Sequence, residues 1–334
     1  MAFSASFFSY KGGAGRTTST LNTSYYLIRE VIRPTNDHPL LIIDADTESA
    51  GISYLLTRNM ASKYISSDRS VQGLCRDARN NGALFNPDNG APMPDLISAY
   101  SALSKKFIPV GDQFGVEEQS VLLLRSNVSG FSMSPEDYVE PVERLIKLVK
   151  DVCKCSVIFD TPTGTQALTN CALRQSDIIV CHMRPTAQFQ QGTKDYLERY
   201  LQQPDTNFKT IILCPSVVPL DTVVIDGKTY PSTYCEQLKT FAEEMKTIVD
   251  NSMSLEVRLV DLMTKPIQDQ WANRFQYASD IMEYRAKNVV GIPEITRFKW
   301  REGLLPTVPS LTKEEKLACE RYFYLANIVA GNVI

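Results

Sequence analysis

Short apolar runs alternate with longer amphipathic stretches along most of the chain. Several runs show little alternation of apolar and polar positions, which is typical of strands covered on both faces. They predict strands at Ser4–Ser9, Pro39–Asp44, Ser120–Leu124, Ser156–Asp160, Asp177–Met183, Thr210–Cys214 and Val289–Ile292. The stretches between them predict helices at Arg16–Ile32, Pro135–Lys150, Gln188–Leu201, Ser232–Asn251, Pro266–Lys287 and Lys313–Val329.

This alternation predicts an α/β fold, with a mostly parallel, twisted sheet of about seven strands flanked by helices on both faces. We expect residues 1–334 to form a single domain, because no break in composition and no repeat divides the chain. Leu56–Gly115 is long for a connection and is predicted to be an elaboration with its own helices. VVIDGKTY, within Val217–Pro231, predicts a small hairpin.

The composition is that of an ordinary globular protein, with 43% hydrophobic residues and a net charge of −3. Nothing in this charge requires a nucleic acid or an anionic membrane as partner. The eight cysteines form no Cys-x-x-Cys pair and only two histidines accompany them, so we expect reduced thiols in a cytoplasmic protein. No run approaches the roughly 20 apolar residues of a membrane span, so no membrane insertion is predicted.

The stretch SYKGGAGRTTST lies between a predicted strand and a predicted helix. Its glycines allow backbone N–H groups to converge on phosphate oxygens, and the helix N-terminus adds a positive dipole. The usual phosphate-loop pattern, GxxxxGK followed by Ser or Thr, is not met, because Arg16 replaces the lysine. Arginine keeps the charge but differs from lysine at a tight phosphate site. Taken alone, the stretch could be a glycine turn without function.

Acidic residues follow two of the apolar strands. LLIIDADTESAG ends in Asp44 and Asp46, which the strand period puts on one face, and VIFDTPTG puts Asp160 at the tip of another strand. Such a pair, taken alone, is more often a capped strand end than a metal site. Ligands of open α/β sheets collect at the carboxyl ends of strands, so we expect the glycine loop and these carboxylates to form one site.

Four segments, in order, resemble the ParA/MinD superfamily of ATPases. KGGAGRTT is similar to its deviant Walker A motif, KGGxGK followed by Ser or Thr. IIDADTESAGIS resembles the second motif, and FDTPTGTQALTNCALRQSD resembles the Walker B block. GIPEITRFKWREGLLPTVP followed by RYFYLANIVA is similar to the closing segment. The closest match is a variant branch with KGGxGR, and the matches bracket nearly the whole chain.

The resemblance implies an ATP site with Mg²⁺ in a P-loop ATPase fold. Lys11 resembles the signature lysine, which in this family reaches across an ATP-sandwich homodimer to the partner's phosphates. Arg16 stands where the phosphate-loop lysine contacts the β- and γ-phosphates, Thr17 would ligate Mg²⁺, and Thr18 would bind the α-phosphate. The backbone of Gly12, Gly13, Ala14 and Gly15 would cradle the phosphates.

The resemblance also implies roles for the acidic residues. Asp46 matches the carboxylate that positions the attacking water, while Asp44 and Asp160 would support Mg²⁺. Cys214 and Pro215 stand where many relatives have an adenine-reading Asn. Pro293 and Glu294 are therefore the remaining candidates for the base pocket.

The leading hypothesis is a slow, partner- or dimer-dependent ATPase that switches the binding of an unidentified protein and leaves DNA open as a further partner. Two alternatives remain. One is a regulatory nucleotide-binding subunit with little or no hydrolysis, which Arg16 makes plausible. The other is an amide ligase or synthetase on the same fold, which Lys11 disfavours because a lysine before the glycines suits a dimer-dependent switch.

Overall fold

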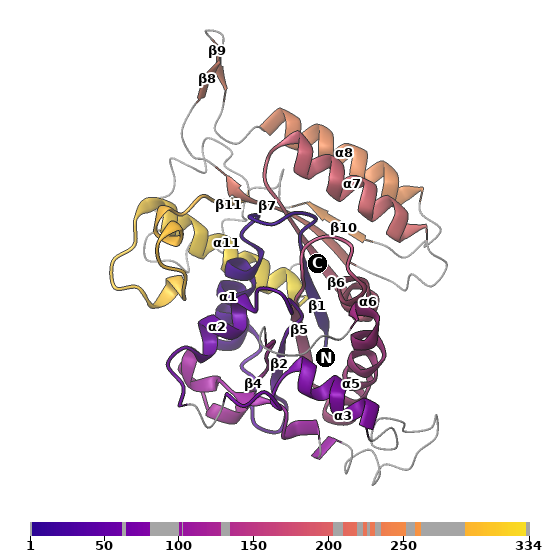
Figure 1. The fold of residues 1–334 in the computed structure, drawn as a ribbon. Helices are drawn as coiled ribbons and strands as arrows, with labels where there is room; N and C mark the ends of the chain where they lie inside the picture. Colours follow the sequence, from indigo (N-terminus) through magenta and orange to yellow (C-terminus); the bar gives the residue numbers. More distant parts are fainter. Residues whose placement is uncertain are drawn as a thin grey trace. The chain divides into compact units, whose positions relative to one another are not determined.

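The computed structural model describes most of the chain in two compact units (Figure 1). Unit 1 comprises Met1–Phe7 and Ile28–Asp177, and unit 2 comprises Phe8–Leu27 and Ile178–Ile334. The expectation of a single domain stays a prediction. The residues described are 2–61, 65–80, 100–101, 103–127, 134–202, 210–218, 223–225, 228–230, 235–251, 258–261 and 291–331.

Unit 1 is built on parallel strands in the order β1-β5-β2-β4, with a short antiparallel strand, β3, on β4. Each parallel strand is buried along nearly its whole length, as its continuous apolar run predicts. The bounds are β1 (Ser4–Phe8), β2 (Leu40–Asp44), β3 (Ile108–Pro109), β4 (Val121–Leu124) and β5 (Ser156–Asp160), with Phe8 of β1 counted in unit 2.

One hydrophobic cluster of unit 1 covers one face of this sheet. There, alternate strand residues pack against α3 (Val71–Asn80), α5 (Val139–Cys153) and α6 (Ala167–Gln175). The strand residues on this face are Leu41, Ile43, Leu122, Leu124, Val157 and Phe159. Because successive side chains of a strand point to opposite faces, the residues between them, including those at the strand ends, belong to the other face. A fourth helix, α2 (Gly51–Thr57), follows β2.

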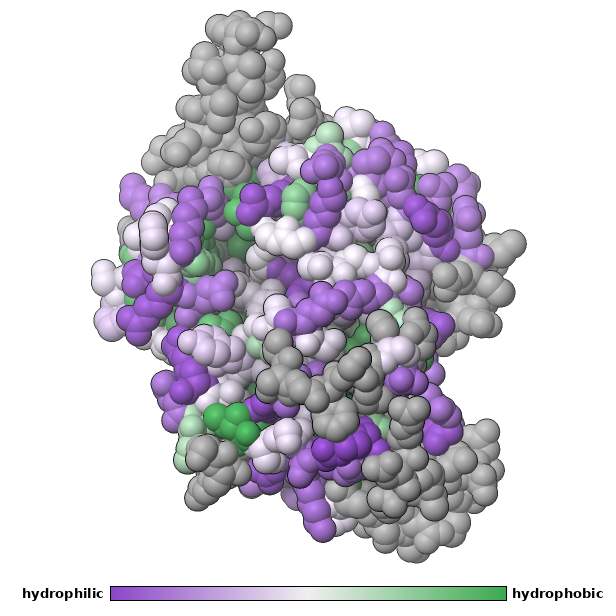
Figure 2. All heavy atoms as spheres, viewed as in Figure 1, coloured by the Kyte–Doolittle hydropathy of each residue, from purple (hydrophilic) through white to green (hydrophobic). Residues whose placement is uncertain are grey.

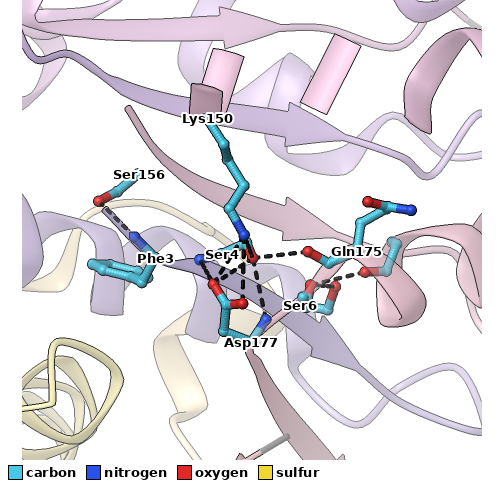
Figure 3. A network of polar contacts seen from close by, with 9 residues as sticks. Phe3, Ser4, Ser6, Lys150, Ser156, Gln175 and Asp177 are labelled. Atoms are coloured by element: carbon cyan, nitrogen blue, oxygen red, sulfur yellow. Dashed lines mark hydrogen bonds and ion pairs between the residues drawn. The ribbon is translucent and has the colours of Figure 1, made fainter. Parts of the chain in front are cut away.

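A polar network holds the amino end of β1 (Figure 3). The Asp177 carboxylate accepts hydrogen bonds from the backbone N–H and the hydroxyl of Ser4, both at 2.8 Å, and lies 3.1 Å from the Lys150 ammonium. Burial raises the pKa of Asp177, but the Ser4 hydrogen bonds and the Lys150 charge outweigh it and leave that pKa lowered. The acidic residue at the end of the Walker B-like block is therefore a structural anchor.

Unit 2 has its own parallel strands and helices. β6 (Ile178–Met183) and β10 (Arg258–Asp261) flank β7 (Thr210–Val218), and β11 (Ile292–Pro293) also pairs with β7. The helices form two packed pairs: α7 (Ala187–Leu201) with α8 (Cys235–Asp250), and α1 (Arg16–Tyr26) with α11 (Lys313–Val329). The predicted hairpin is confirmed as β8 (Val223–Ile225) and β9 (Lys228–Tyr230).

The predicted fold class is confirmed, and most predicted elements agree with the structure within a few residues. Three differ at an end: α1 gives way to a π-helical turn at Leu27–Val31, α5 starts at Val139 after a 3₁₀ turn, and β7 runs on to Val218. Short helices α2, α3 and α6 were not predicted individually, although α3 lies in the proposed elaboration Leu56–Gly115. The predicted helix Pro266–Lys287 and residues 289–290 lie outside the described residues.

On the face shown in Figure 2, hydrophilic side chains are interspersed with small apolar areas. Tyr54 and Trp300 are the large hydrophobic side chains that stand out as exposed within the described residues. The cysteine side chains described, those of Cys75, Cys155, Cys171, Cys181, Cys214 and Cys319, are all buried free thiols. None of the helices that can be described combines the length and the apolar character needed to cross a membrane.

Candidate nucleotide site

The glycine loop leaves β1 in a conformation that depends on glycine. Gly13 (φ 79°) and Gly15 (φ 70°) adopt left-handed backbone angles, where a side chain would be strained. Just before the loop, the Tyr10 ring packs so closely on α7 that a Cβ on Gly192 would lie 2.2 Å from it. The contact between the Tyr10 ring and Gly192 therefore fixes the position of the chain just before Lys11.

The first turn of α1 has no side-chain cap. Its N-cap residue is Gly15, no acidic residue lies in the first turn, and no capping hydrogen bond is made from the described side chains. By contrast, α11 begins with a full capping box between Thr312 and Glu315. The amide groups at the start of α1 are thus available to an anion, for which a helix N-terminus is well suited.

Two side chains hold the loop from unit 2. The Ser216 hydroxyl donates to the carbonyl of Ala14 at 2.5 Å, and Arg184 Nε donates to the carbonyl of Gly13 at 2.7 Å. Next to Ser216, Val217 has φ 55°, an outlier for a β-branched residue, and its Cγ2 lies 3.3 Å from where a Gly15 Cβ would be. Backbone strain of this kind clusters at functional sites.

A cavity of about 220 Å³ opens beside the loop within unit 2. Gly13, Gly15 and Thr18 line it together with Pro293 and Glu294, the residues predicted for the base pocket. Glu294 is held by its backbone N–H, which donates to the Val218 carbonyl at 2.8 Å, and by an ion pair with Lys299 at 2.8 Å. Cys214 and Pro215 are not among the lining residues.

The other loop residues differ in exposure. Lys11 and Thr17 are half-buried, Gly12 is exposed, and Ala14, Arg16 and Thr18 are buried. The Arg16 charge acts on His182 of β6, a fully buried imidazole whose pKa is lowered to about 3 by burial and by that charge. His182 is therefore neutral at physiological pH, so it adds no second positive charge to that of Arg16.

Two of the predicted carboxylates stand at paired positions of unit 1. Asp44 ends β2, Asp160 ends β5, and the two residues are partners in the parallel register. Both are fully buried. Burial, followed by the charge of Asp160, raises the pKa of Asp44 to about 7, although hydrogen bonds from Ser53 work against this rise.

Hydrogen bonds fix the Asp44 carboxylate firmly. The backbone N–H of Ser53 donates to it at 2.9 Å, the Ser53 hydroxyl at 2.5 Å, and the backbone N–H of Asp46 at 3.1 Å. Ser126, just beyond β4, donates its N–H to the Ser53 hydroxyl at 2.9 Å and its own hydroxyl to the Asp44 carbonyl at 2.8 Å. The start of α2 and the end of β4 are thereby tied to Asp44.

Asp46 lies two residues further and organises a turn. Its Oδ1 accepts the backbone N–H groups of Glu48 at 3.3 Å and of Ser49 at 3.0 Å. Only 7% of the Asp46 residue is exposed. The capped strand end that the sequence suggested is present, and Asp44 and Asp46 share a face as predicted, because Ala45 between them lies in the opposite core.

The donor set in unit 1 suits Mg²⁺ bound with help from a nucleotide. Mg²⁺ prefers oxygen ligands and commonly takes one or two carboxylates, with waters and phosphate oxygens completing its shell. Asp44 and Asp160 offer such a pair, and no cluster of three or more His, Cys, Asp or Glu side chains that could hold a metal occurs in the described residues. This arrangement favours a metal ion bound jointly by protein and nucleotide over one bound by protein alone.

A larger cavity, of about 370 Å³, lies at the amino ends of β2 and β5. Arg33, His38 and Lys154 line it, and none of the predicted nucleotide-binding residues does. Size alone would favour this cavity, but ligands of open α/β sheets bind at the carboxyl ends of strands. The smaller cavity, which the glycine loop lines, is therefore the candidate nucleotide site.

Several site residues were missed by the sequence reasoning, namely Ser53, Arg125, Ser126, Arg184, Ser216 and Val217. Arg125 carries a signal that could have been used, because it follows the apolar strand VLLL just as Asp44 follows LLII. Only 8% of Arg125 is exposed. The serines offer no comparable signal, since their roles depend on which strands are neighbours.

Comparisons with known proteins address the fold. Neither the protein-family models nor the curated protein sequences give a match to this chain. Solved structures do: an ATP complex of an aspartate-to-alanine variant of Cyanothece McdA matches with a TM-score of 0.55 at 13% identity, covering 99% of this chain and 96% of that one. The chain has the ParA/MinD ATPase fold.

Two further structures agree. A ParA family ATPase from Chlorobium tepidum matches with a TM-score of 0.50 at 14% identity, covering 97% of each chain. The pNOB8 ParA structure matches with a TM-score of 0.50 at 12% identity, covering 99% of each. At these identities the likeness establishes the ParA/MinD fold over nearly the whole chain, and the residue roles are taken up below as proposals.

Proposed function

We propose that this protein is an ATP-dependent switch that binds ATP with Mg²⁺, forms a homodimer around the nucleotide and thereby regulates a protein partner. The observation that carries the proposal is the uncapped start of α1, which follows the glycine loop beside a cavity that Pro293 and Glu294 also line. A helix N-terminus without a cap is suited to phosphate. The ParA/MinD fold supports the same reading.

The proposed roles follow the family motifs. The backbone of Gly12–Gly15 and the side chains of Arg16 and Thr18 would bind phosphates, while Pro293 and Glu294 would contact the base. Thr17, Asp44 and Asp160 would hold Mg²⁺, whose charge would stabilise the phosphates during transfer to water. Asp46 would position that water, and Lys11 would reach the partner's nucleotide.

The second candidate function is that of a nucleotide-binding protein that hydrolyses ATP slowly or not at all. It is favoured by Arg16, whose planar fork replaces the lysine and whose side chain is buried beside His182. In that case the protein would act as a regulatory nucleotide-binding subunit. The cycle would then depend on nucleotide exchange instead of turnover.

One experiment separates these functions. ATP turnover and light-scattering mass are measured with and without ATP and Mg²⁺ for wild type, Lys11→Ala and Asp46→Ala, with the exposed Lys154→Ala as a matched control. We expect an ATP-dependent dimer that Lys11→Ala loses and Asp46→Ala retains without turnover. A dimer without turnover in wild type would favour the regulatory subunit, and a monomer in every condition would reject the switch.

Turnover that requires an added small carboxylate would point to the ligase alternative. Cyanothece McdA, whose variant was solved with ATP, and the ParA proteins supply the family precedent for nucleotide binding. DNA binding by this chain stays a separate proposal, to be tested with duplex DNA in the same light-scattering assay.

A further inference from the structure

Unit 1 contains a row of three buried charged residues across neighbouring strands. Asp160 pairs with Asp44, and β2 pairs with β4 up to Ile43 and Leu124, so Arg125 is the next residue after the last paired position. Adjacent strands lie about 4.8 Å apart. Asp160, Asp44 and Arg125 therefore follow one another across β5, β2 and β4 at their carboxyl ends.

Arg125 belongs to the same face as the two carboxylates. Leu124 lies in the core formed with α3, α5 and α6, as do Ile43 and Phe159, the residues before Asp44 and Asp160. Strand alternation puts the three charged residues on the opposite face. Burial lowers the pKa of the Arg125 guanidinium, and the Asp44 charge works against this lowering, which agrees with the placement of the two groups on one face.

The Arg125 guanidinium is not fully hydrogen-bonded within the described residues. Its Nε is buried without a hydrogen-bond partner, and only 8% of the residue is exposed. Its backbone, by contrast, is fixed: the Arg125 carbonyl accepts the Val71 N–H at 2.9 Å, and the next residue, Ser126, is tied to Asp44. A buried guanidinium N–H without a hydrogen-bond partner, on a backbone that is fixed, is costly for stability unless it binds a ligand.

We propose that Arg125 is an anion-binding residue that takes a phosphoryl group, either the terminal phosphate of bound ATP or the inorganic phosphate released from it. The proposal rests on the ATP-dependent function proposed above. An arginine fork matches phosphate oxygens in two parallel hydrogen bonds, and its location at the carboxyl ends of parallel strands is where ligands of this fold class collect.

Three variants test this role. Arg125→Met removes the charge at similar length, Arg125→Lys keeps the charge without the fork, and Arg174→Met removes a surface arginine that pairs with Glu143. Affinities for ATP with Mg²⁺, ADP with Mg²⁺ and inorganic phosphate are measured by calorimetric titration, and melting temperatures of the unliganded proteins by scanning calorimetry.

We expect Arg125→Met to melt at least about 2 °C higher than wild type, because a buried N–H group without a hydrogen-bond partner is gone. A loss of about tenfold or more in ATP affinity with unchanged ADP affinity identifies the terminal phosphate as the ligand. An equal loss for inorganic phosphate, with ATP unchanged, identifies the released phosphate. Arg125→Lys should be intermediate and Arg174→Met unchanged.

Unchanged affinities in Arg125→Met would overturn the proposal, as would an affinity loss accompanied by a lower melting temperature, which would assign Arg125 to packing. A wild type that binds neither nucleotide would reject the proposed function instead. In that case the inorganic phosphate titration still tests Arg125. If wild type and Arg125→Met bind phosphate equally, or if neither binds it, the proposed role of Arg125 is overturned.

Discussion

The row of buried charged residues in unit 1 (Asp160, Asp44 and Arg125) and the glycine loop of unit 2 are built in different ways. In unit 1, buried charged side chains are held by serine hydroxyls, as at Asp44 and Ser53. In unit 2, the loop is shaped by backbone angles at Gly13, Gly15 and Val217, and its Gly13 and Ala14 carbonyls accept hydrogen bonds from Arg184 and Ser216. Hydrogen bonds between side chains thus dominate the first region, and left-handed backbone angles dominate the second.

This difference bears on Arg16, which begins α1. The loop before it is shaped by backbone conformation, which does not depend on the side chain at position 16. The region around Asp44 has no such freedom, because the Ser53 and Ser126 hydroxyls hold it through their own hydrogen bonds. Four predictions test this contrast, from the largest expected effect to the smallest.

Gly291→Ala tests the backbone just before Ile292 and Pro293, which line the unit 2 cavity. Gly291 has φ 77°, and a Cβ there would lie 2.3 Å from the Pro215 carbonyl oxygen. Strain and overlap together should lower the free energy of unfolding by about 3–4 kcal/mol, measured by urea denaturation. Gly12→Ala is the control, because no atom lies within 4 Å of its Cβ position and its stability should change by less than about 0.5 kcal/mol.

His182→Leu tests whether unit 2 excludes a second charge beside Arg16. The pKa of His182 is about 3 in the folded protein against an ordinary 6.5, so between these values the unfolded chain binds a proton that the folded chain does not. Wild-type stability should therefore be complete above pH 6.5 and fall as the pH drops toward 3.

At about pH 4, the unfolding free energy of wild type should have fallen by about 3 kcal/mol relative to that of His182→Leu. Urea denaturation at a series of pH values measures this difference. The protein's other histidine, His38, is exposed, so His38→Asn should keep the wild-type acid sensitivity. The same pH dependence in wild type and His182→Leu would show that His182 accepts its proton in the folded protein.

Ser53→Ala tests the side-chain-built region. The Ser53 hydroxyl donates to Asp44 and accepts from the Ser126 N–H, so its loss removes one of the donors to the buried carboxylate and leaves the Ser126 N–H without this acceptor. We expect a loss of about 2 kcal/mol in unfolding free energy. Ser49→Ala, in the exposed turn before α2, should change it by less than about 0.5 kcal/mol. Equal losses of unfolding free energy in Ser53→Ala and Ser49→Ala would contradict the role given to the Ser53 hydroxyl.

Lys150→Ala tests the polar network at the amino end of β1, for comparison with the region around Asp44 in the same unit. The Lys150–Asp177 pair is partly exposed, with half of the Asp177 side chain accessible. Its loss should therefore lower the unfolding free energy by less than about 1 kcal/mol, and less again in high salt. Lys147→Ala, an exposed lysine one turn earlier on α5, is the control for the lost positive charge.

Much of the fold could be predicted because its strands are continuous apolar runs. β5 and α11 have the predicted bounds, since Asp160 ends an apolar run and the Thr312–Glu315 capping box starts a helix. Short helices such as α6 escaped prediction because nine residues carry little periodicity. The extension of β7 past Pro215 depends on its pairing with β11, a contact distant in sequence.

The candidate site was predictable where one residue type carries the chemistry. Asp44 and Asp160 were found because a charge after a buried strand is unusual, and their pairing follows from parallel strands. Ser216 and Arg184 could not be found in this way, because each acts on a loop carbonyl far away in the chain. Residue roles within the site stay predictions until the variants are measured.

The division of the chain into two interleaved units has a consequence for synthesis on the ribosome. Unit 1 has all its segments once Asp177 has emerged, whereas Phe8–Leu27 must wait for the rest of unit 2. α1, which follows the glycine loop, packs against α11, whose residues are made long after it. The nascent chain thus carries the glycine loop through the synthesis of both units before the helix that follows the loop gains its packing partner.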